Sequence, residues 1–484
     1  MSKDKKVVEF LKGSAVLALA NIVLKSINFV LLPLYTKYLS PSELGISDTI
    51  TTFSALLFPL LVMGLDSAFS AFYFDEESDE HHSLVLNTVW FTLAVNSIIP
   101  LLLCAFAGMI SNLLFSSSQY WIIVILSMVS VTANLLFIPF ALEMRMKNRM
   151  VTFAIINLSA STIMIISNIV FVTKLKWGAT SLIASTLIAQ CLQLIVYLCI
   201  SKSKIKFEFF NLDLWKKMMK FAIPMIPTVI AVWALSMSDR YMLLYFLDES
   251  QVGIYGIAAR FSSVIAVISN AVYIAYTSFA FDKKNDANAR EQYRRILSAF
   301  FFVIFGMCFT ISFFGKEILG FMTNSRYHYA YKIMPGVLFG QISYGVYTIV
   351  SYGIAFAKKT KYSFLATGSG AIANIILNLI FVPLFGIQAT ANINFIGYSV
   401  MCIVGYFFSN KLFPCDYKIG RIIFSMVLGY SIIILGLELS IFVKFGIWII
   451  VFVSGCIVFR DVMNDFSNTF KMIIDKIMPK ERQR

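Results

Sequence analysis

Residues 84–109 read LVLNTVWFTLAVNSIIPLLLCAFAGM and carry no charged side chain. A helix rises about 1.5 Å per residue, so a run of this length can cross a hydrocarbon core roughly 30 Å thick. The whole chain has the same character: 59% of its 484 residues are hydrophobic, 14% are charged, and its mean hydropathy is +0.79. Soluble domains are roughly 45–50% apolar and about 25% charged. The composition therefore excludes a soluble protein and a disordered chain, and it predicts an integral membrane protein.

Fourteen apolar runs long enough to span a membrane follow one another along the chain. They lie at 12–38, 46–70, 84–109, 119–142, 151–173, 178–200, 219–246, 252–280, 296–314, 333–356, 362–384, 388–410, 421–439 and 443–460. We predict an all-α polytopic membrane protein with about 14 transmembrane helices.

The distribution of Lys and Arg predicts the orientation of these helices. Segments on the side of the N-terminus hold 30 of these residues, and segments on the other side hold seven, among them Lys444. The positive-inside rule then places both termini in the cytoplasm. The net charge of +14 is explained by these inner loops, so we expect no nucleic-acid partner. Ala18-Leu19-Ala20 resembles a signal-peptide cleavage site, but cleavage there would destroy the first span.

Two pairs of similar segments indicate an internal duplication. Residues 38–46 (YLSPSELGI) resemble residues 246–254 (FLDESQVGI) at an offset of 208, and residues 168–172 (NIVFV) resemble residues 378–382 (NLIFV) at an offset of 210. Repeats of this length predict two pseudo-symmetric six-helix lobes that run in the same direction, with the substrate site between them.

This duplication predicts four parts of the chain. They are an N-terminal six-helix lobe at 1–200, a cytoplasmic inter-lobe linker at 201–218, a C-terminal six-helix lobe at 219–411, and two extra transmembrane helices with a basic cytoplasmic tail at 412–484.

Motifs for catalysis, metals and cofactors are missing from the sequence. Six of the seven Cys lie inside apolar runs without paired spacing, and three His are too few for a zinc site of known spacing. There is no phosphate-binding loop and no hydrolase motif. An enzyme of this class would need a large outer loop with catalytic residues, and the longest outer loop, 315–332, is short. We therefore expect no enzyme, no metal and no cofactor.

Three cations lie within predicted spans and away from the span ends, and an ionisable residue at such a position points to function. Lys25 belongs to a stripe of residues spaced by three or four, which share one face of the first helix: Ser14, Ala18, Asn21, Lys25 and Asn28. A second stripe lies on the span at 252–280: Gly253, Gly256, Arg260, Ser263 and Asn270. The third cation, Arg240, adjoins Asp239 on the span at 219–246, where Pro224 and Pro227 predict a kink.

Buried cations facing a cavity would serve an anion such as an acidic solute or a phosphorylated lipid headgroup. The other interpretation is that Lys25 only binds backbone carbonyls in a packed bundle. Asp239 and Asp48 are candidates for ion coupling, although charge balance alone would also explain Asp239.

Several motifs resemble those of Wzx-type polysaccharide flippases, in the multidrug/oligosaccharidyl-lipid/polysaccharide exporter superfamily. The segments that carry the resemblance are FAIPMIP (221–227), SDRY (238–241), VGIYGIA (252–258), YLSPSELG (38–45), GLDSA (64–68) and the spaced residues Asn374, Asn378, Pro383, Gly386 and Ile387. The sequence departs from the family pattern at Ala71, where Arg is usual, and at Gln388-Ala389-Thr390, where Gly-Ala-Ala is usual. These departures weaken a finer assignment.

The resemblance implies a flippase of the bacterial plasma membrane. Such a protein moves undecaprenyl-diphosphate-linked oligosaccharide units from the inner to the outer leaflet by alternating access, for capsule, O-antigen or exopolysaccharide synthesis. It implies H+ or Na+ as the coupling ion, and a polysaccharide polymerase and chain-length proteins as partners. Lipid II flippases of the superfamily bind the diphosphate with cations on helices 1 and 8, which here carry Lys25 and Arg260. Arg240 is a further candidate for the diphosphate, and Asn21, Asn28 and Asn270 are candidates for sugar or water contacts.

Two other functions of the same superfamily stay open. One is a lipid II flippase, and the other is a cation-coupled multidrug exporter. A cationic drug fits poorly beside Lys25 and Arg260, because like charges repel.

Overall fold

All regular secondary structure in the described part of the chain is helical. The computed structural model describes residues 29–201, 205–206, 210–286 and 288–465, and these ranges contain no strand. They hold 12 helices long and apolar enough to cross a membrane. The all-α membrane fold predicted from the sequence is therefore confirmed.

One of these helices has the length of two membrane passages. Helix α18 (Lys361–Leu412) has 52 residues, which corresponds to roughly 78 Å. Its backbone turns at Gly386, where φ is 63° and ψ is −148°, a conformation that only glycine adopts readily. This break separates the predicted spans 362–384 and 388–410. The first predicted span is described only from residue 29 onward, so the count of 14 stays a prediction.

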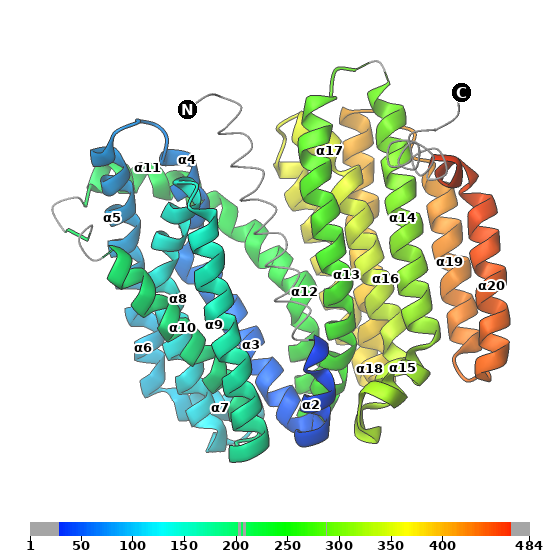
Figure 1. Ribbon diagram of the computed structural model, residues 1–484, viewed down its shortest axis with the longest axis horizontal. Coiled ribbons are helices and arrows are strands. Elements are labelled where there is room, and N and C mark those ends of the chain that lie inside the picture. Colours follow the sequence, from blue (N-terminus) through cyan, green and yellow to red (C-terminus); the bar gives the residue numbers. More distant parts are fainter. Residues whose placement is uncertain (1–28, 202–204, 207–209, 287, 466–484) are drawn as a thin grey trace, which may run out of the picture. The chain divides into compact units, whose positions relative to one another are not determined.

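The chain divides into two compact units, and each is described by itself. Unit 1 comprises residues 1–260, 322–327 and 375–390. Its helices are α2 (Leu32–Tyr38), α3 (Pro41–Val62), α4 (Leu65–Phe72), α5 (Asp79–Asn96), α6 (Ile98–Ala105), α7 (Ala107–Phe115), α8 (Trp121–Met146), α9 (Met150–Val170), α10 (Thr180–Ser201), α11 (Leu212–Ala222), α12 (Ile226–Phe246) and the first part of α13 (Glu249–Asp282) (Figure 1). Helix α8 contacts α3, α5, α6, α9 and α10, so it forms the centre of this unit.

Local sequence explains where two of these helices begin. Ser40 caps α3: its hydroxyl accepts a hydrogen bond from the Glu43 amide, and the Glu43 carboxylate accepts one from the Ser40 amide at 2.7 Å. A 3-10 turn at Ile223–Met225 separates α11 from α12. This turn contains Pro224, so the predicted kink is confirmed.

Unit 2 comprises residues 261–321, 328–374 and 391–484. Besides the rest of α13 and most of α18, its helices are α14 (Ala289–Phe313), α15 (Gly315–Met322), α16 (Ala330–Val350), α17 (Tyr352–Phe356), α19 (Ile419–Gly436) and α20 (Ile441–Val458). The span that contains α16 is the most buried of the candidate spans, with 78% of its most apolar stretch inside the protein, so it forms the centre of unit 2.

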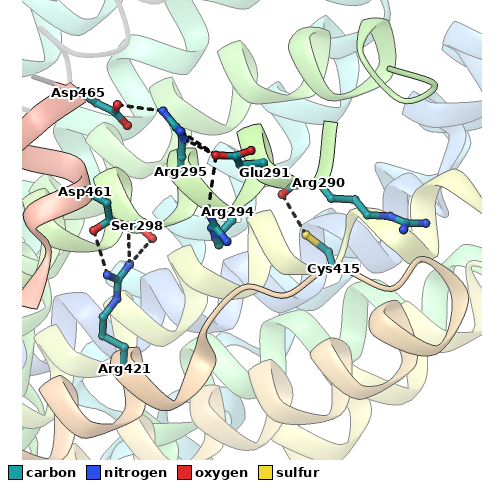
Figure 2. Close-up of polar contacts among 9 residues, drawn as sticks. All are labelled: Arg290, Glu291, Arg294, Arg295, Ser298, Cys415, Arg421, Asp461 and Asp465. Carbon is teal, nitrogen blue, oxygen red and sulfur yellow. Dashed lines mark hydrogen bonds and ion pairs between the residues drawn. The ribbon is translucent and has the colours of Figure 1, made fainter. Parts of the chain in front are cut away.

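Ion pairs hold α19 and α20 against α14 at one end of these helices. Arg421 near the start of α19 pairs with Asp461 beyond α20 at 2.9 Å, and it donates a hydrogen bond to Ser298 of α14 at 2.8 Å (Figure 2). Arg295 of α14 contacts Asp465 at 3.1 Å.

An ion pair with a buried lysine holds α20 at the opposite end. Lys444 is 0% exposed, and its ammonium lies 2.9 Å from the Glu317 carboxylate of α15. The sequence count assigned Lys444 to an outer loop, and this was wrong: the residue lies within α20. Its stem packs in the interior, where Glu317 compensates the charge.

Candidate functional site

Helices α3 and α13 cross in unit 1 with their backbones almost in contact. A Cβ added at Gly45 would lie 1.7 Å from the carbonyl oxygen of Glu249, and one added at Gly253 would lie 1.9 Å from that of Pro41. Any side chain at either position would push the helices apart, because real Cβ atoms do not approach within 3.0 Å. The crossing therefore requires both glycines.

The contacts at this crossing are reciprocal. Gly45 faces Glu249 and Gly253 faces Pro41. Glu249 follows Pro41 by 208 residues, and Gly253 follows Gly45 by the same number. Each repeat thus presents the same surface to the other, as in an isologous interface. The offset found in the sequence corresponds here to a local pseudo-two-fold contact.

One turn further along, the same crossing brings Asp48 to Arg260. The two terminal guanidinium nitrogens of Arg260 lie 3.1 and 3.4 Å from the two carboxylate oxygens of Asp48, and the side chains of Arg260 and Asp48 are 19% and 18% exposed. A fork-to-fork pair of this kind is directional as well as charged. Gly256 makes room for it, because a Cβ there would lie 2.0 Å from Asp48 Oδ2.

Asp239 of α12 forms the second polar group in unit 1. Its side chain is fully buried. The Tyr255 hydroxyl donates a hydrogen bond to one carboxylate oxygen at 2.6 Å, and the Asn378 amide donates one to the other at 3.1 Å. These donors compensate part of the cost of burying a carboxylate.

Arg240, the neighbour of Asp239, lies near the ring of the same tyrosine and near Met237. Its guanidinium lies 3.3 Å from the Met237 sulfur and 5.9 Å from the centre of the Tyr255 ring. Since adjacent helical residues are about 100° apart, Tyr255 is contacted from two sides, by Asp239 at its hydroxyl and by Arg240 at its ring.

The remaining predicted residues lie elsewhere. Lys25, Asn21 and Asn28 fall outside the described residues. Asn270 is exposed on the part of α13 that belongs to unit 2, where it lines a separate cavity. No group of three or more metal-binding side chains occurs within the described ranges.

Sequence reasoning missed Tyr255 as a partner of Asp239 and did not pair Asp48 with Arg260. Tyr255 lies in the quoted segment 252–258, but a tyrosine in an apolar span usually signals packing. The repeated glycines were the available signal for the helix crossing.

What this site can do follows from its charges. The guanidinium of Arg260 pairs with the Asp48 carboxylate, and another anion with two oxygens would compete for the same nitrogens. Asp48 and Asp239 are the carboxylates that could exchange a proton or a small cation during such a competition.

Two family models match the sequence. Residues 10–276 match the family described as polysaccharide biosynthesis protein, which is more than half of the 484 residues. Residues 224–380 match the MatE family. A comparison with curated proteins gives no match.

Solved structures of transporters share the fold. A structure of the lipid II flippase MurJ in an inward closed conformation superposes with a TM-score of 0.72 at 21% identity, covering 92% of this chain and 99% of the other. An inward-facing multidrug resistance MATE family transporter of the MOP superfamily gives 0.64 at 12% identity, covering 84% and 98%. An outward-facing structure of such a transporter gives 0.57 at 13% identity, covering 86% and 94%. The chain therefore belongs to the polysaccharide biosynthesis protein family, and it has the fold of the MurJ and MATE transporters of the MOP superfamily.

Proposed function

We propose that this protein is a flippase for undecaprenyl-diphosphate-linked oligosaccharide units. It moves them from the inner to the outer leaflet of a bacterial plasma membrane by alternating access. The observation that carries the proposal is Arg260, an arginine within a membrane span of a polysaccharide biosynthesis protein, poised with both guanidinium nitrogens on a single carboxylate. Both termini lie in the cytoplasm, according to the bias of Lys and Arg.

In this proposal the diphosphate and Asp48 compete for Arg260. Diphosphate oxygens match the guanidinium fork as a carboxylate does. Lys25 adds a second positive charge, and Arg240 is a weaker candidate. Asn21, Asn28 and Asn270 contact sugar hydroxyls or water.

The competition links substrate binding to an ion. When the diphosphate takes Arg260, Asp48 loses its partner, and an uncompensated carboxylate inside a protein is costly. Uptake of H+ or Na+ by Asp48 removes this cost. Asp239 is the second coupling candidate, because it is fully buried and already held by two donors.

The polyprenyl tail lies in an apolar groove of unit 2. Helices α14, α19 and α20 enclose a cavity of about 600 Å³, lined by side chains such as Phe302 and Trp448. Gly306 opens onto it, since a Cβ there would meet no atom within 4 Å. Gly306→Leu should therefore weaken binding of a full-length tail more than of a truncated one. Gly446→Leu is the matched control, because Gly446 has equally open space and does not line the groove.

A transport assay in proteoliposomes tests the main proposal. Lipid-linked oligosaccharide is reconstituted in the inner leaflet and its appearance outside is followed. Arg260→Ala should lower affinity for undecaprenyl diphosphate on the order of ten- to hundredfold, because one charged contact of about 1.5–3 kcal/mol is lost. Arg260→Lys should be milder, since it keeps the charge and loses the fork.

Asp48→Asn tests the coupling of transport to the ion. It should tighten binding of the diphosphate and make transport insensitive to the ion gradient. Asp66→Asn serves as the control, because Asp66 is exposed on α4 and forms no ion pair within the part of the chain that the structure describes. Unchanged diphosphate affinity in a well-folded Arg260→Ala variant would refute the anion site.

The same assay discriminates the two alternatives. Lipid II and a cationic drug are offered in place of the oligosaccharide. Transport of lipid II alone would make the protein a lipid II flippase, and export of the drug alone would make it a multidrug exporter.

A further inference from the structure

A cavity in unit 2 is lined almost entirely by hydroxyl, amide and aromatic side chains. It has a volume of about 360 Å³, at the lower end of the range of ligand sites, which is roughly 300–1,000 Å³. Nine of its 11 lining residues carry a hydroxyl or an amide, and four of these are tyrosines. None of the described lining residues is charged.

The cavity is built by helix faces rather than by loops. Asn270, Tyr273 and Thr277 are spaced by three and four, so they share one face of α13. Tyr344 and Thr348 are spaced by four along α16, and Ser351 follows directly after the end of that helix. Polar groups on rigid elements hold their directions better than groups on loops.

The tyrosine rings differ in their roles. Tyr352 is 4% exposed, its hydroxyl is hydrogen-bonded to Thr277, and its ring packs edge-on against Tyr276 at 4.7 Å. It therefore forms a fixed wall. Tyr273 is 42% exposed, and its ring centre lies 6.3 Å from that of Tyr352. Its free ring surface is a place on which a flat or saturated ring can pack.

This chemistry restricts the ligand. A diphosphate would find no cation among the lining residues, and a cationic drug would find no carboxylate. A neutral ring with many hydroxyls fits this lining, because its faces can pack on tyrosine and its edges can exchange hydrogen bonds with amide and hydroxyl groups.

We propose that this cavity is a glycan subsite that binds a neutral sugar of the transported oligosaccharide. The inference rests on the proposed flippase function and deepens it. The cavity lies near the end of α13, where Phe281 lines it, and near the start of α18, where Ser363 lines it. The orientation proposed above puts these helix ends at the cytoplasmic side, where the lipid-linked unit is loaded.

The test compares three probes on the purified full-length protein. They are the lipid-linked oligosaccharide from a strain that lacks this protein, undecaprenyl diphosphate without sugar, and the released oligosaccharide without lipid. Tyr273→Ala and Asn270→Ala should each lower affinity for both glycan-bearing probes about two- to tenfold, and leave undecaprenyl diphosphate unaffected. Tyr273→Phe should retain most of the affinity, since it keeps the ring surface.

The control is Tyr329→Ala, because Tyr329 is 41% exposed, nearly as much as Tyr273, and lies outside the cavity. Melting curves confirm that each variant is folded. If the released oligosaccharide binds and Tyr273→Ala removes this binding, the subsite is supported. Failure of undecaprenyl diphosphate to bind would then count against the flippase function alone and not against the subsite. Full affinity of folded Tyr273→Ala and Asn270→Ala for both glycan-bearing probes would overturn the subsite, whatever the effect of Arg260→Ala.

Discussion

The glycine crossing of α3 and α13 makes a quantitative prediction for Gly45→Ala. The new Cβ would lie 1.7 Å from the Glu249 carbonyl oxygen, whereas such atoms do not approach within 3.0 Å. The helices must therefore separate by about 1.3 Å at this point. The obstacle is backbone on both sides, so no side chain can rotate away to relieve it.

The expected cost follows from two opposing effects. Overpacking of this kind typically costs about 1–3 kcal/mol, while replacing Gly by Ala inside a helix gains roughly 0.5–1 kcal/mol. A net loss of up to about 2.5 kcal/mol is expected. Separation of the helices also pulls Asp48 away from Arg260, now at 3.1 Å.

Thermal unfolding of the purified protein measures this cost, and transport measures its consequence. Gly368→Ala is the matched control, because Gly368 lies inside α18 and a Cβ there meets nothing within 4 Å. It should be neutral or slightly stabilising. Gly253→Ala should resemble Gly45→Ala, and the double variant should cost less than the sum, since one opening accommodates both methyl groups. Equal stability of Gly45→Ala and Gly368→Ala would refute the reasoning.

Three further predictions concern single contacts. Tyr255→Phe removes a donor to buried Asp239 and should lower the free energy of unfolding by about 1.5–3 kcal/mol, which a denaturation curve checks; no change would show that Tyr255 is not needed. Lys444→Met leaves Glu317 without its cation and should lower the free energy of unfolding by about 2–4 kcal/mol, toward the low end because Glu317 is 28% exposed. A Lys444→Met, Glu317→Gln double variant should recover most of this loss. Failure to recover it would contradict the pairing. In the loop before α20, hydrogen bonds from Lys316 and Tyr331 lower the pKa of Glu438 from 4.5 to about 2. Because the pKa of Glu438 is lower in the folded than in the unfolded protein, the ionised carboxylate stabilises the fold above about pH 4.5, and this stabilisation is lost as the pH falls toward 2. The difference in melting temperature between wild type and Glu438→Gln should therefore shrink over that range.

Much of the site could be named from the sequence, but not its pairing. Arg260 and Asp239 stood out because a charge in an apolar run is conspicuous in any hydropathy profile. Asp48 was recognised as a candidate carboxylate, yet 212 residues separate it from Arg260. No local sequence pattern predicts that these two side chains pair, since the pairing depends on where two helices cross. The burial of Lys444 could not be predicted for the same reason: its partner Glu317 lies on another helix.

The sequence by itself determined the membrane class, nearly all of the spans and the kink at Pro224, because run length and proline act through the local backbone. It also revealed the 208-residue repeat. Only the tertiary structure decided that the repeated glycines face each other, that Arg260 is matched by Asp48, and that tyrosines from three helices line one cavity. These features depend on which helix faces pack together, and packing is set by shape complementarity over the whole fold rather than by residues near in the chain.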